Sequence, residues 1–388
     1  MIDPADLAVR RTGPYVYKSA LKRRAAGALD RLGDLLLAPR PAAVPWAAVR
    51  RVAVLRLDHL GDVLFALPAL RALRRALPAA QVDLFVGPWG REAAGLGRAA
   101  DRLHVFDAPW FWRPRRVEWP WKAIAGLAGE LRRGDFDLGI DLRGDLRHGL
   151  ALWASGIPWR AGHTLTAGRF LLTHPVEARP GLHEVEQNLS LLSGLGLPGG
   201  GAGPALPRVF PPSAAAAEAG RLWKELGLGV RVVAAQAASG AASKLWPEEN
   251  WARLLDGLPR GFQAVLLGSG PERPAMERLA RRCRRRPALA TGRLGLGGLA
   301  AFLKRCRLLV SLDSGPAHLA AAVGTPVLAL YSGTNLLPQW GPRGSRVEAI
   351  QKAPACSPCE LAACPLDNAC MRAIGADEAL AAVRRMLK

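Results

Sequence analysis

The sequence predicts an α/β protein made of two Rossmann-like, doubly wound domains that face each other across an interdomain cleft. From about residue 51, short apolar runs rich in β-formers alternate with longer segments of helical periodicity. This alternation stops in a Gly- and Pro-rich stretch at 200–213 and then begins again. A chain of 388 residues, 50% of them hydrophobic, is long enough to bury two cores.

The first domain is expected at 51–199. Its predicted strands are RVAVLRL from Arg51, QVDLFVG from Gln81, LHVFDA from Leu103 and FDLGIDL from Phe136. Between the first two strands, the segment from Val63 to Ala76 has apolar residues at helical spacing and ends before Pro78. These elements form one doubly wound unit.

The second domain is expected at 214–350, after a linker at 200–213. Its predicted strands are VRVVAAQ from Val230, FQAVLLGSG from Phe262, RLLVSLDSG from Arg307 and TPVLALYSG from Thr325. Because parallel sheets of this kind bind ligands beyond the carboxyl ends of their strands, we expect the functional site in the cleft.

Two flanking segments fall outside these domains. Residues 1–50 form a basic extension with an amphipathic helix, and residues 351–388 hold a Cys-rich segment and a C-terminal helix. The apolar stripe of the first helix is Leu21, Ala25, Ala28, Leu29, Leu32 and Leu36, and its basic positions are Lys18, Lys22, Arg24 and Arg31. Such a helix either lies on the inner membrane or packs on the N-terminal domain.

The charge balance alone selects no partner. With 53 Lys and Arg against 32 Asp and Glu, the formal net charge is +21, which suits nucleic acid, an anionic membrane or a phosphorylated substrate, or reflects coding bias. No nucleic-acid-binding motif is evident, so we expect no nucleic-acid partner. The sequence also lacks a signal-peptide pattern and an apolar run long enough to cross a bilayer, which predicts a cytoplasmic location.

The first chemical motif follows the first strand, in VAVLRLDHLGDVLFALP from Val52. The strand enters a tight turn at Asp58 to Gly61, which Gly61 permits, and a helix opens at Asp62 and Val63. This position places Asp62 at or next to the N-cap, so it is either a functional carboxylate or only a cap. One glycine is a poor match to the three-glycine dinucleotide fingerprint, which argues against an NAD enzyme.

A second motif follows the strand that ends near Leu312. Asp313, Ser314 and Gly315 form a turn, and Pro316 fits the first turn of the next helix. Free N–H groups and the positive end of the helix dipole make this a seat for a diphosphate, to which His318 adds a donor. The alternatives are plain turn chemistry and a core histidine.

Two other strand-end turns offer related chemistry. Ser239, Ser243 and Lys244 follow the first strand of the second domain and can surround the same phosphates, although Lys244 is also consistent with a solvated loop. In the GSGPE segment, Glu272 is placed to accept hydrogen bonds from ribose hydroxyls.

Taken together, these segments resemble glycosyltransferase family nine, the heptosyltransferase family. The resemblance rests on DHLGDVL with PALRALR, on FDLGIDLRG, on SKLWPEENW and on DSGPAHLAAAVGTP, in family order from Val52 to about Pro342. It implies a GT-B fold, an acceptor site in the N-terminal domain and a donor site in the C-terminal domain.

The resemblance also implies roles for single residues. Asp62 matches the catalytic base, Lys244 a lysine at the donor phosphates, Glu272 a nucleoside contact and Asp313 the sugar-contacting aspartate. The phosphate-binding turn matches Ser314, Gly315 and His318, where Ser314 replaces a frequent threonine. The expected acceptor-side residues are Asp58, His59, Gly61, Asp141 and Arg143.

The implied activity is inverting transfer of a heptose from ADP-heptose to a lipopolysaccharide core or related glycolipid, with no cofactor needed for catalysis. The implied partners are a nucleoside diphosphate sugar, an anionic glycolipid and the inner face of the membrane. A sugar-nucleotide epimerase and a basic, non-catalytic protein that binds sugar nucleotides or nucleic acid remain as alternatives. Cys356, Cys359, Cys364 and Cys370 are expected to form a structural clip, by zinc, an iron–sulfur cluster or disulfides.

Overall fold

The computed structural model describes residues 15–17, 19–37, 43–111, 120–179, 181–197 and 206–388. The chain divides between residues 205 and 206 into two domains, which are described separately. Of the predicted linker at 200–213, residues 200–205 lie outside the described residues, as does Lys18.

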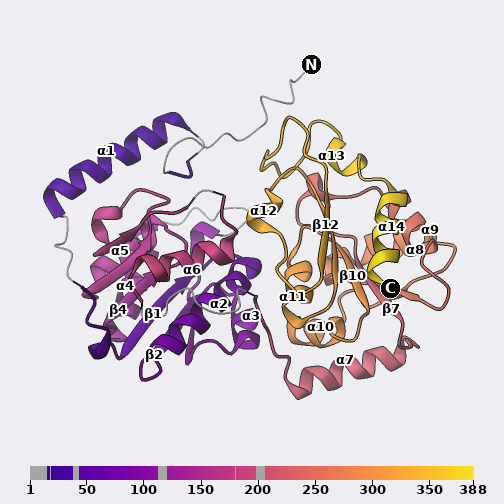
Figure 1. Cartoon of the computed structure of the whole chain (residues 1–388), viewed down its shortest axis with the longest axis horizontal. Helices are drawn as coiled ribbons and strands as arrows, with labels where there is room; N and C mark the ends of the chain where they lie inside the picture. The colour runs from indigo at the N-terminus through magenta and orange to yellow at the C-terminus, as the bar shows by residue number, and fades with distance from the viewer. Residues whose placement is uncertain (1–14, 18, 38–42, 112–119, 180, 198–205) are drawn as a thin grey trace. The chain divides into compact units, whose positions relative to one another are not determined.

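The N-terminal domain is built on a parallel sheet with the strand order β3-β2-β1-β4-β5-β6 (Figure 1). Each neighbouring pair is parallel, and Val52 of β1 is in register with Val82 on one side and Leu138 on the other. This is the Rossmann order, in which the chain direction across the sheet reverses between β1 and β4. The strands are β1 (Arg51–Arg56), β2 (Gln81–Val86), β3 (Arg102–Val105), β4 (Leu138–Asp141), β5 (Trp159–His163) and β6 (His174–Val176).

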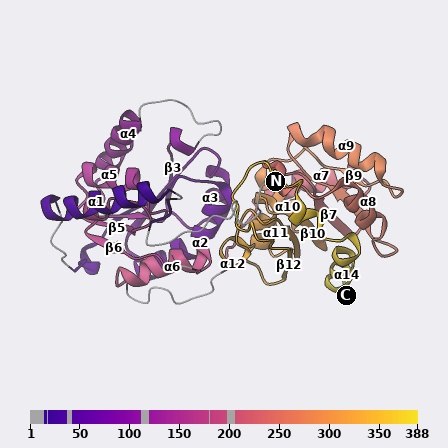
Figure 2. The ribbon, with the colours of Figure 1, turned by 90° about the horizontal axis from the view of Figure 1, so that it is seen from above.

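Two helix layers cover this sheet (Figures 1 and 2). Helix α2 packs against α3 and α6, whereas α4 packs against α5. Alternate residues of β1 face the two layers, because Ala53 and Leu55 join the core beneath α4 and α5 while Arg56 points toward α2 and α6. The helices are α2 (Leu60–Ala76), α3 (Arg91–Gly97), α4 (Pro120–Arg133), α5 (Leu146–Ser155) and α6 (Glu184–Gly194), with short turns η2 (Trp46–Ala48), η3 (Pro109–Phe111) and η4 (Arg169–Leu171).

The C-terminal domain repeats this architecture, with the strand order β12-β11-β10-β7-β8-β9. Counted from its own first strand, this is the same Rossmann order, and the reversal falls between β7 and β10. Its strands are β7 (Val232–Gln236), β8 (Gln263–Leu266), β9 (Ala288–Leu289), β10 (Leu308–Leu312), β11 (Val327–Tyr331) and β12 (Val347–Gln351).

Helices α7, α10 and α11 pack in one group, and α8, α9 and α14 in another. The second group closes an apolar core that includes the buried Trp246 and Trp251. The helices are α7 (Ser213–Glu225), α8 (Glu248–Asp256), α9 (Arg273–Arg282), α10 (Leu296–Leu303), α11 (Gly315–Val323), α12 (Leu337–Trp340), α13 (Ala369–Arg372) and α14 (Ala376–Met386), with turns η5 (Ala242–Lys244) and η6 (Gly270–Glu272).

The eight predicted strands are confirmed, and β5, β6, β9 and β12 are additional. The predicted start of the helix after β1 is wrong: α2 begins at Leu60, so Asp62 is its third residue and His59 is the N-cap. Gly61 therefore lies inside the first helical turn and is not among the glycines with positive φ. The turn does not depend on its conformational freedom.

Helix α1 (Ala20–Leu37) packs on its own domain through Ala26, Asp30 and Gly33. The Asp30 carboxylate accepts hydrogen bonds from the backbone N–H of Gly168 at 2.6 Å and of Arg169 at 3.2 Å. Gly33 lies against the ring of Phe170, where an added Cβ would come within 2.2 Å of ring carbons. The packing interpretation therefore holds, through a face other than the predicted apolar stripe. No helix among the described residues combines the length and apolarity needed to span a membrane.

Candidate active site

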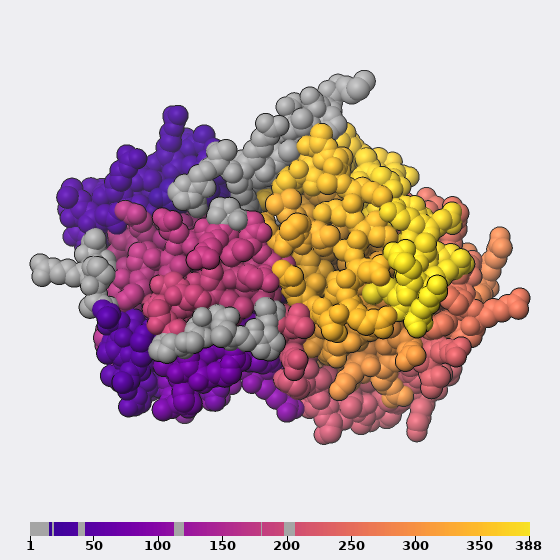
Figure 3. All heavy atoms as spheres, viewed as in Figure 1, coloured from indigo at the N-terminus to yellow at the C-terminus, as the bar shows by residue number. Residues whose placement is uncertain are grey.

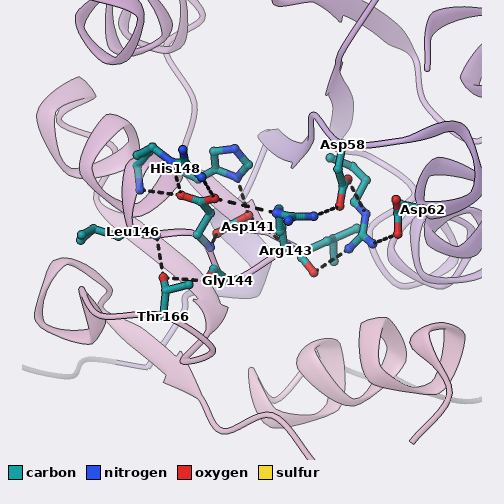
Figure 4. Close-up of polar contacts among 12 residues, drawn as sticks. Asp58, Asp62, Asp141, Arg143, Gly144, Leu146, His148 and Thr166 are labelled. Carbon is teal, nitrogen blue, oxygen red and sulfur yellow. Dashed lines mark hydrogen bonds and ion pairs between the residues drawn. The ribbon is translucent and has the colours of Figure 1, made fainter. Parts of the chain in front are cut away.

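A buried cluster of charges lies where the strand order of the N-terminal sheet reverses. Asp58 follows β1, Asp141 ends the neighbouring β4, and the loop after β4 carries Arg143. Figure 4 shows Arg143 lying between Asp58 and the Asp141 turn, with Asp62 on the far side of Asp58. The topology therefore brings together residues that follow different strands.

Arg56 is the centre of this cluster, although the sequence did not single it out. Its guanidinium is almost fully buried, with Nε 2.9 Å from Asp58 and a terminal nitrogen 3.1 Å from Asp62. The same terminal nitrogen lies 2.9 Å from Glu184 of α6, and the other donates to the carbonyl of Leu142 at 2.9 Å. One buried arginine thus holds three carboxylates in place.

Asp62 has one carboxylate oxygen on Arg56, and the other accepts a hydrogen bond from the backbone N–H of His59 at 3.2 Å. The second contact belongs to a capping box, so Asp62 does cap α2. Its side chain is nevertheless 14% exposed. Burial and the charge of Asp58 raise the pKa of Asp62, despite the opposing effect of Arg56. A raised pKa strengthens a carboxylate as a proton acceptor.

Asp58 differs from Asp62 because it is completely buried between two arginines. Its second oxygen lies 2.5 Å from Arg143. Burial opposes ionisation, but the charges of Arg56 and Arg143 outweigh it and hold the pKa of Asp58 below its ordinary value. Asp58 is thus a fixed anion of the cluster, with neither oxygen open to a substrate.

Glu184 is a second functional candidate that the sequence did not indicate. It lies in the first turn of α6, 128 residues from Arg56 in sequence, and is 15% exposed. Burial, helped by the charge of Asp62, raises its pKa to about 7 although Arg56 opposes the shift. The two partly exposed carboxylates therefore share one guanidinium nitrogen.

Asp141 holds its own loop in place and has little capacity left for an acceptor. It accepts hydrogen bonds from the backbone N–H of Arg143 at 3.0 Å and of Asp145 at 2.8 Å, and pairs with Nδ1 of His148 at 2.9 Å. Burial disfavours the charged imidazole, yet Asp141 and Asp145 raise the pKa of the buried His148. Gly144 has a φ of 70°, and a Cβ there would lie 2.5 Å from the carbonyl oxygen of His163. The loop therefore fixes the backbone that carries Arg143.

In the C-terminal domain, the corresponding reversal carries a smaller set of charges. Lys244, after β7, lies 2.6 Å from the carboxylate of Asp313, which follows β10. Asn335, after β11, donates to the same oxygen at 2.8 Å. Burial opposes the charge on Asp313, but Lys244 lowers its pKa below the ordinary value. Two residues predicted to touch different parts of a donor thus form one ion pair.

The turn after Asp313 has the predicted helix N-terminus. Ser314 is the N-cap of α11 and Gly315 its first residue, and the Ser314 hydroxyl lies 3.2 Å from that of Ser311. His318 lies within the first helical turns and is buried. Burial, with the nearby charge of Lys244, lowers its pKa to about 4 although Asp313 opposes the shift. The imidazole is therefore neutral at neutral pH and acts as a dipole.

The remaining predicted donor residues differ in their availability. Ser243 is buried and donates its hydroxyl hydrogen to the carbonyl of Leu361 at 2.5 Å, so the loop packing engages it. Ser239 accepts only a long contact from the backbone N–H of Ala241, at 3.4 Å. Glu272 closes a capping box by accepting from the backbone N–H of Ser269 at 2.6 Å. Because β8, β7 and β10 are neighbours, all three loops share one sheet edge.

The Cys-rich segment fastens the donor loops through hydrogen bonds. Asn368 donates to the carbonyl of Ala242 at 2.7 Å, and Cys370 Sγ accepts from the N–H of Gly333 at 3.3 Å. All four of its cysteines are free thiols, and among the described residues no group of three or more His, Cys, Asp or Glu side chains is arranged to hold a metal. The contacts of Asn368 and Cys370 fasten the segment to the donor loops, and a clip by zinc, an iron–sulfur cluster or disulfides at these cysteines stays a prediction.

The two Rossmann-like domains, each with a six-stranded parallel sheet of the same strand order, make up a GT-B fold. The profile of glycosyltransferase family 9 (heptosyltransferase) matches residues 124–370, and the chain belongs to this family. The matched segment includes Arg143, Lys244 and Asp313. It begins after Asp62, so it does not bear on the proposed base.

Individual proteins to which this chain is similar are also heptosyltransferases. Lipopolysaccharide heptosyltransferase 3 of Escherichia coli is 32% identical over 42% of this chain, and the match spans about half of that relative, 48%. Lipopolysaccharide heptosyltransferase 1 of Pseudomonas aeruginosa is 29% identical over 74% of this chain and 79% of its own length. The structure of the E. coli heptosyltransferase WaaC with ADP has a TM-score of 0.65 at 21% identity, covering 87% of this chain and 99% of WaaC, which shows a common fold.

Proposed function

We propose that this protein transfers a heptose from ADP-heptose to a lipopolysaccharide core or related glycolipid, with inversion and without a metal cofactor. The observation that carries the proposal is Asp62, a partly exposed carboxylate with a raised pKa at the strand reversal of the N-terminal sheet. A general base of this kind suits the activation of an acceptor hydroxyl.

In the proposed step, a carboxylate oxygen of Asp62 takes the proton of the acceptor hydroxyl. The hydroxyl oxygen forms a bond to the anomeric carbon as the bond from that carbon to the diphosphate oxygen breaks, and the electron pair leaves with ADP. Arg56 holds Asp62 through one oxygen, and the cap contact with His59 holds the other. Both contacts limit the motion of the carboxylate before transfer.

The C-terminal domain is proposed to hold the donor. The N-terminus of α11 offers backbone N–H groups to the diphosphate, and Lys244 supplies the cation that balances charge on the leaving group. The neutral His318 adds a dipole rather than a second charge. The ADP bound to the related WaaC structure supports an adenosine diphosphate donor here. We place this reaction in the cytoplasm, at the membrane face that holds the glycolipid.

The test is a transfer assay with the purified protein, truncated lipopolysaccharide acceptors and ADP-, UDP- and GDP-sugars, with and without EDTA. We expect mass spectrometry to show a heptosylated acceptor and free ADP, at a rate that EDTA does not change. An isomerised sugar nucleotide formed without acceptor would instead identify an epimerase. If the protein binds the donor but forms no product with any acceptor, it is a non-catalytic sugar-nucleotide-binding protein. If it binds only nucleic acid, in a salt-sensitive manner, the proposal is refuted.

A further inference from the structure

The outward face of α1 is an apolar surface on an otherwise polar helix. Leu21 is 76% exposed and Leu35 is 82% exposed, and both lie opposite the face that packs on η4. At 100° per residue, the exposed leucines form one stripe centred about 120° around the helix axis from Ala26, Asp30 and Gly33. We call it the leucine face; it comprises Leu21, Leu29, Leu32, Leu35 and Leu36, with the exposed Ala25 and Ala28 between them.

Basic residues border the leucine face on both sides. Lys22 lies along one edge, and Arg24 and Arg31 lie along the other, all three exposed. This arrangement of apolar centre and cationic edges is typical of helices that lie in the plane of a membrane interface.

The acidic residues of α1 point the opposite way. Asp30 is buried against Gly168 and Arg169 and also accepts a hydrogen bond from the Tyr15 hydroxyl at 2.7 Å. Asp34 forms an ion pair with the Arg169 side chain. Both carboxylates are therefore neutralised on the packed side, and the exposed side of α1 carries cations only.

We propose that the leucine face of α1 docks on an anionic lipid bilayer, with the helix axis parallel to the surface and the three cations at the lipid phosphates. Helix α1 lies on the outside of its domain (Figures 1 and 3), and the five leucines of this face are 41% to 82% exposed. A second copy of this chain fits less well, because two such faces would bring six cations together without a single acid. The proposal goes beyond sugar transfer and does not depend on the donor or acceptor.

The first test measures flotation of the full chain with vesicles of phosphatidylcholine and phosphatidylglycerol. The variant Leu21→Gln/Leu32→Gln/Leu36→Gln replaces three leucines by a residue of similar helix propensity. We expect its vesicle affinity to fall roughly 100-fold, because three apolar side chains no longer leave water. The control Val230→Gln changes a residue that is 85% exposed in the other domain and should bind as the unmodified chain does.

The second test separates the charges from the leucines. Lys22→Gln/Arg24→Gln/Arg31→Gln should lose about 100-fold in affinity for the anionic vesicles and little for pure phosphatidylcholine. Its control, Arg260→Gln/Arg281→Gln/Arg286→Gln, removes the same charge from exposed positions of the other domain and should keep its affinity.

Three outcomes would overturn the proposal. In the first, the unmodified chain binds neither kind of vesicle. In the second, the variants and their controls lose vesicle affinity equally. In the third, the chain is a dimer in solution and the leucine variant converts it to monomers. Circular dichroism of each variant shows whether α1 is retained. Because binding is measured without donor or acceptor, these results stand apart from the outcome of the transfer assay.

Discussion

The two strand reversals of this protein have the same topology but opposite chemistry. Between β1 and β4, two arginines pair with three carboxylates, of which Asp62 and Glu184 remain partly exposed. Between β7 and β10, a single carboxylate is paired with Lys244, next to a helix N-terminus. The first edge thus offers proton acceptors, and the second offers positive potential for an anion.

The capping boxes sharpen this contrast because the same local motif occurs in both domains. His59 with Asp62 begins α2, and Ser269 with Glu272 begins the turn before α9. Only Asp62 also contacts a buried arginine. The fold therefore provides two equivalent capping acids, and the surrounding charges make one of them a candidate base.

The largest expected effect is on transfer by Asp62→Asn. Asparagine keeps the cap but cannot take a proton, so we expect kcat to fall by roughly 10² to 10⁴ with unchanged donor binding and stability. The matched control is Glu272→Gln, which alters the equivalent cap in the donor domain and should affect the donor KM rather than kcat. Near-normal transfer by Asp62→Asn would show that Asp62 is only a cap.

The next largest effect is on stability, from Arg56→Met. Removing this cation leaves buried carboxylates without their shared partner, which should cost about 3–5 kcal/mol of unfolding free energy. Arg143→Met is the control, because Arg143 is 40% exposed and leaves Asp58 paired with Arg56; about 1 kcal/mol is expected. Urea denaturation measures both, and equal losses would argue against Arg56 as the centre of the cluster.

A smaller effect is expected on donor affinity from Lys244→Met. Losing one charged contact to the diphosphate should weaken ADP binding by roughly 10- to 100-fold, without added metal. Lys304→Met removes an exposed lysine at the end of α10 and should leave binding unchanged. Thermal protection by ADP is the measurement. If ADP protects Lys244→Met as strongly as it protects the unmodified protein, the role of this lysine is only to neutralise Asp313.

The sequence predicts well those features that are local to a strand end. Asp62, Lys244 and Asp313 each follow an apolar run, so a strand and the turn after it suffice to mark them. Strands that lack an apolar run of their own were not predicted. An example is β9, whose two residues pair only because β8 is already in place. Tertiary packing, rather than local propensity, creates them.

The charged cluster around Asp62 could not be predicted from local sequence patterns, because tertiary packing creates it as well. Arg56 is a charged residue inside an apolar strand, and only its partners from α2 and α6 explain its burial. Glu184 lies at the start of α6, where an acidic residue is ordinary helix chemistry. Conversely, the sequence predicted Ser243 as a phosphate ligand, but its hydroxyl donates a hydrogen bond to the carbonyl of Leu361, 118 residues later in the chain.

The smallest expected effect concerns pH and comes from Glu184→Gln. Because folding raises the pKa of Glu184 from 4.5 to about 7, the folded protein binds more protons between these values. This contribution therefore lowers stability as pH rises from about 4.5 to about 7, and Glu184→Gln should remove that slope. Urea denaturation across this range measures the change.

The same substitution should alter catalysis through Asp62. Replacing Glu184 removes a competitor for Arg56, which lowers the pKa of Asp62, so the acidic limb of kcat should move to lower pH. Glu186→Gln is the control, because Glu186 lies on the same helix but faces His183 at 3.6 Å. An equal shift in both variants would assign the effect to the charge of α6 as a whole. A uniform loss of kcat at every pH would instead make Glu184 a structural partner of Arg56 alone.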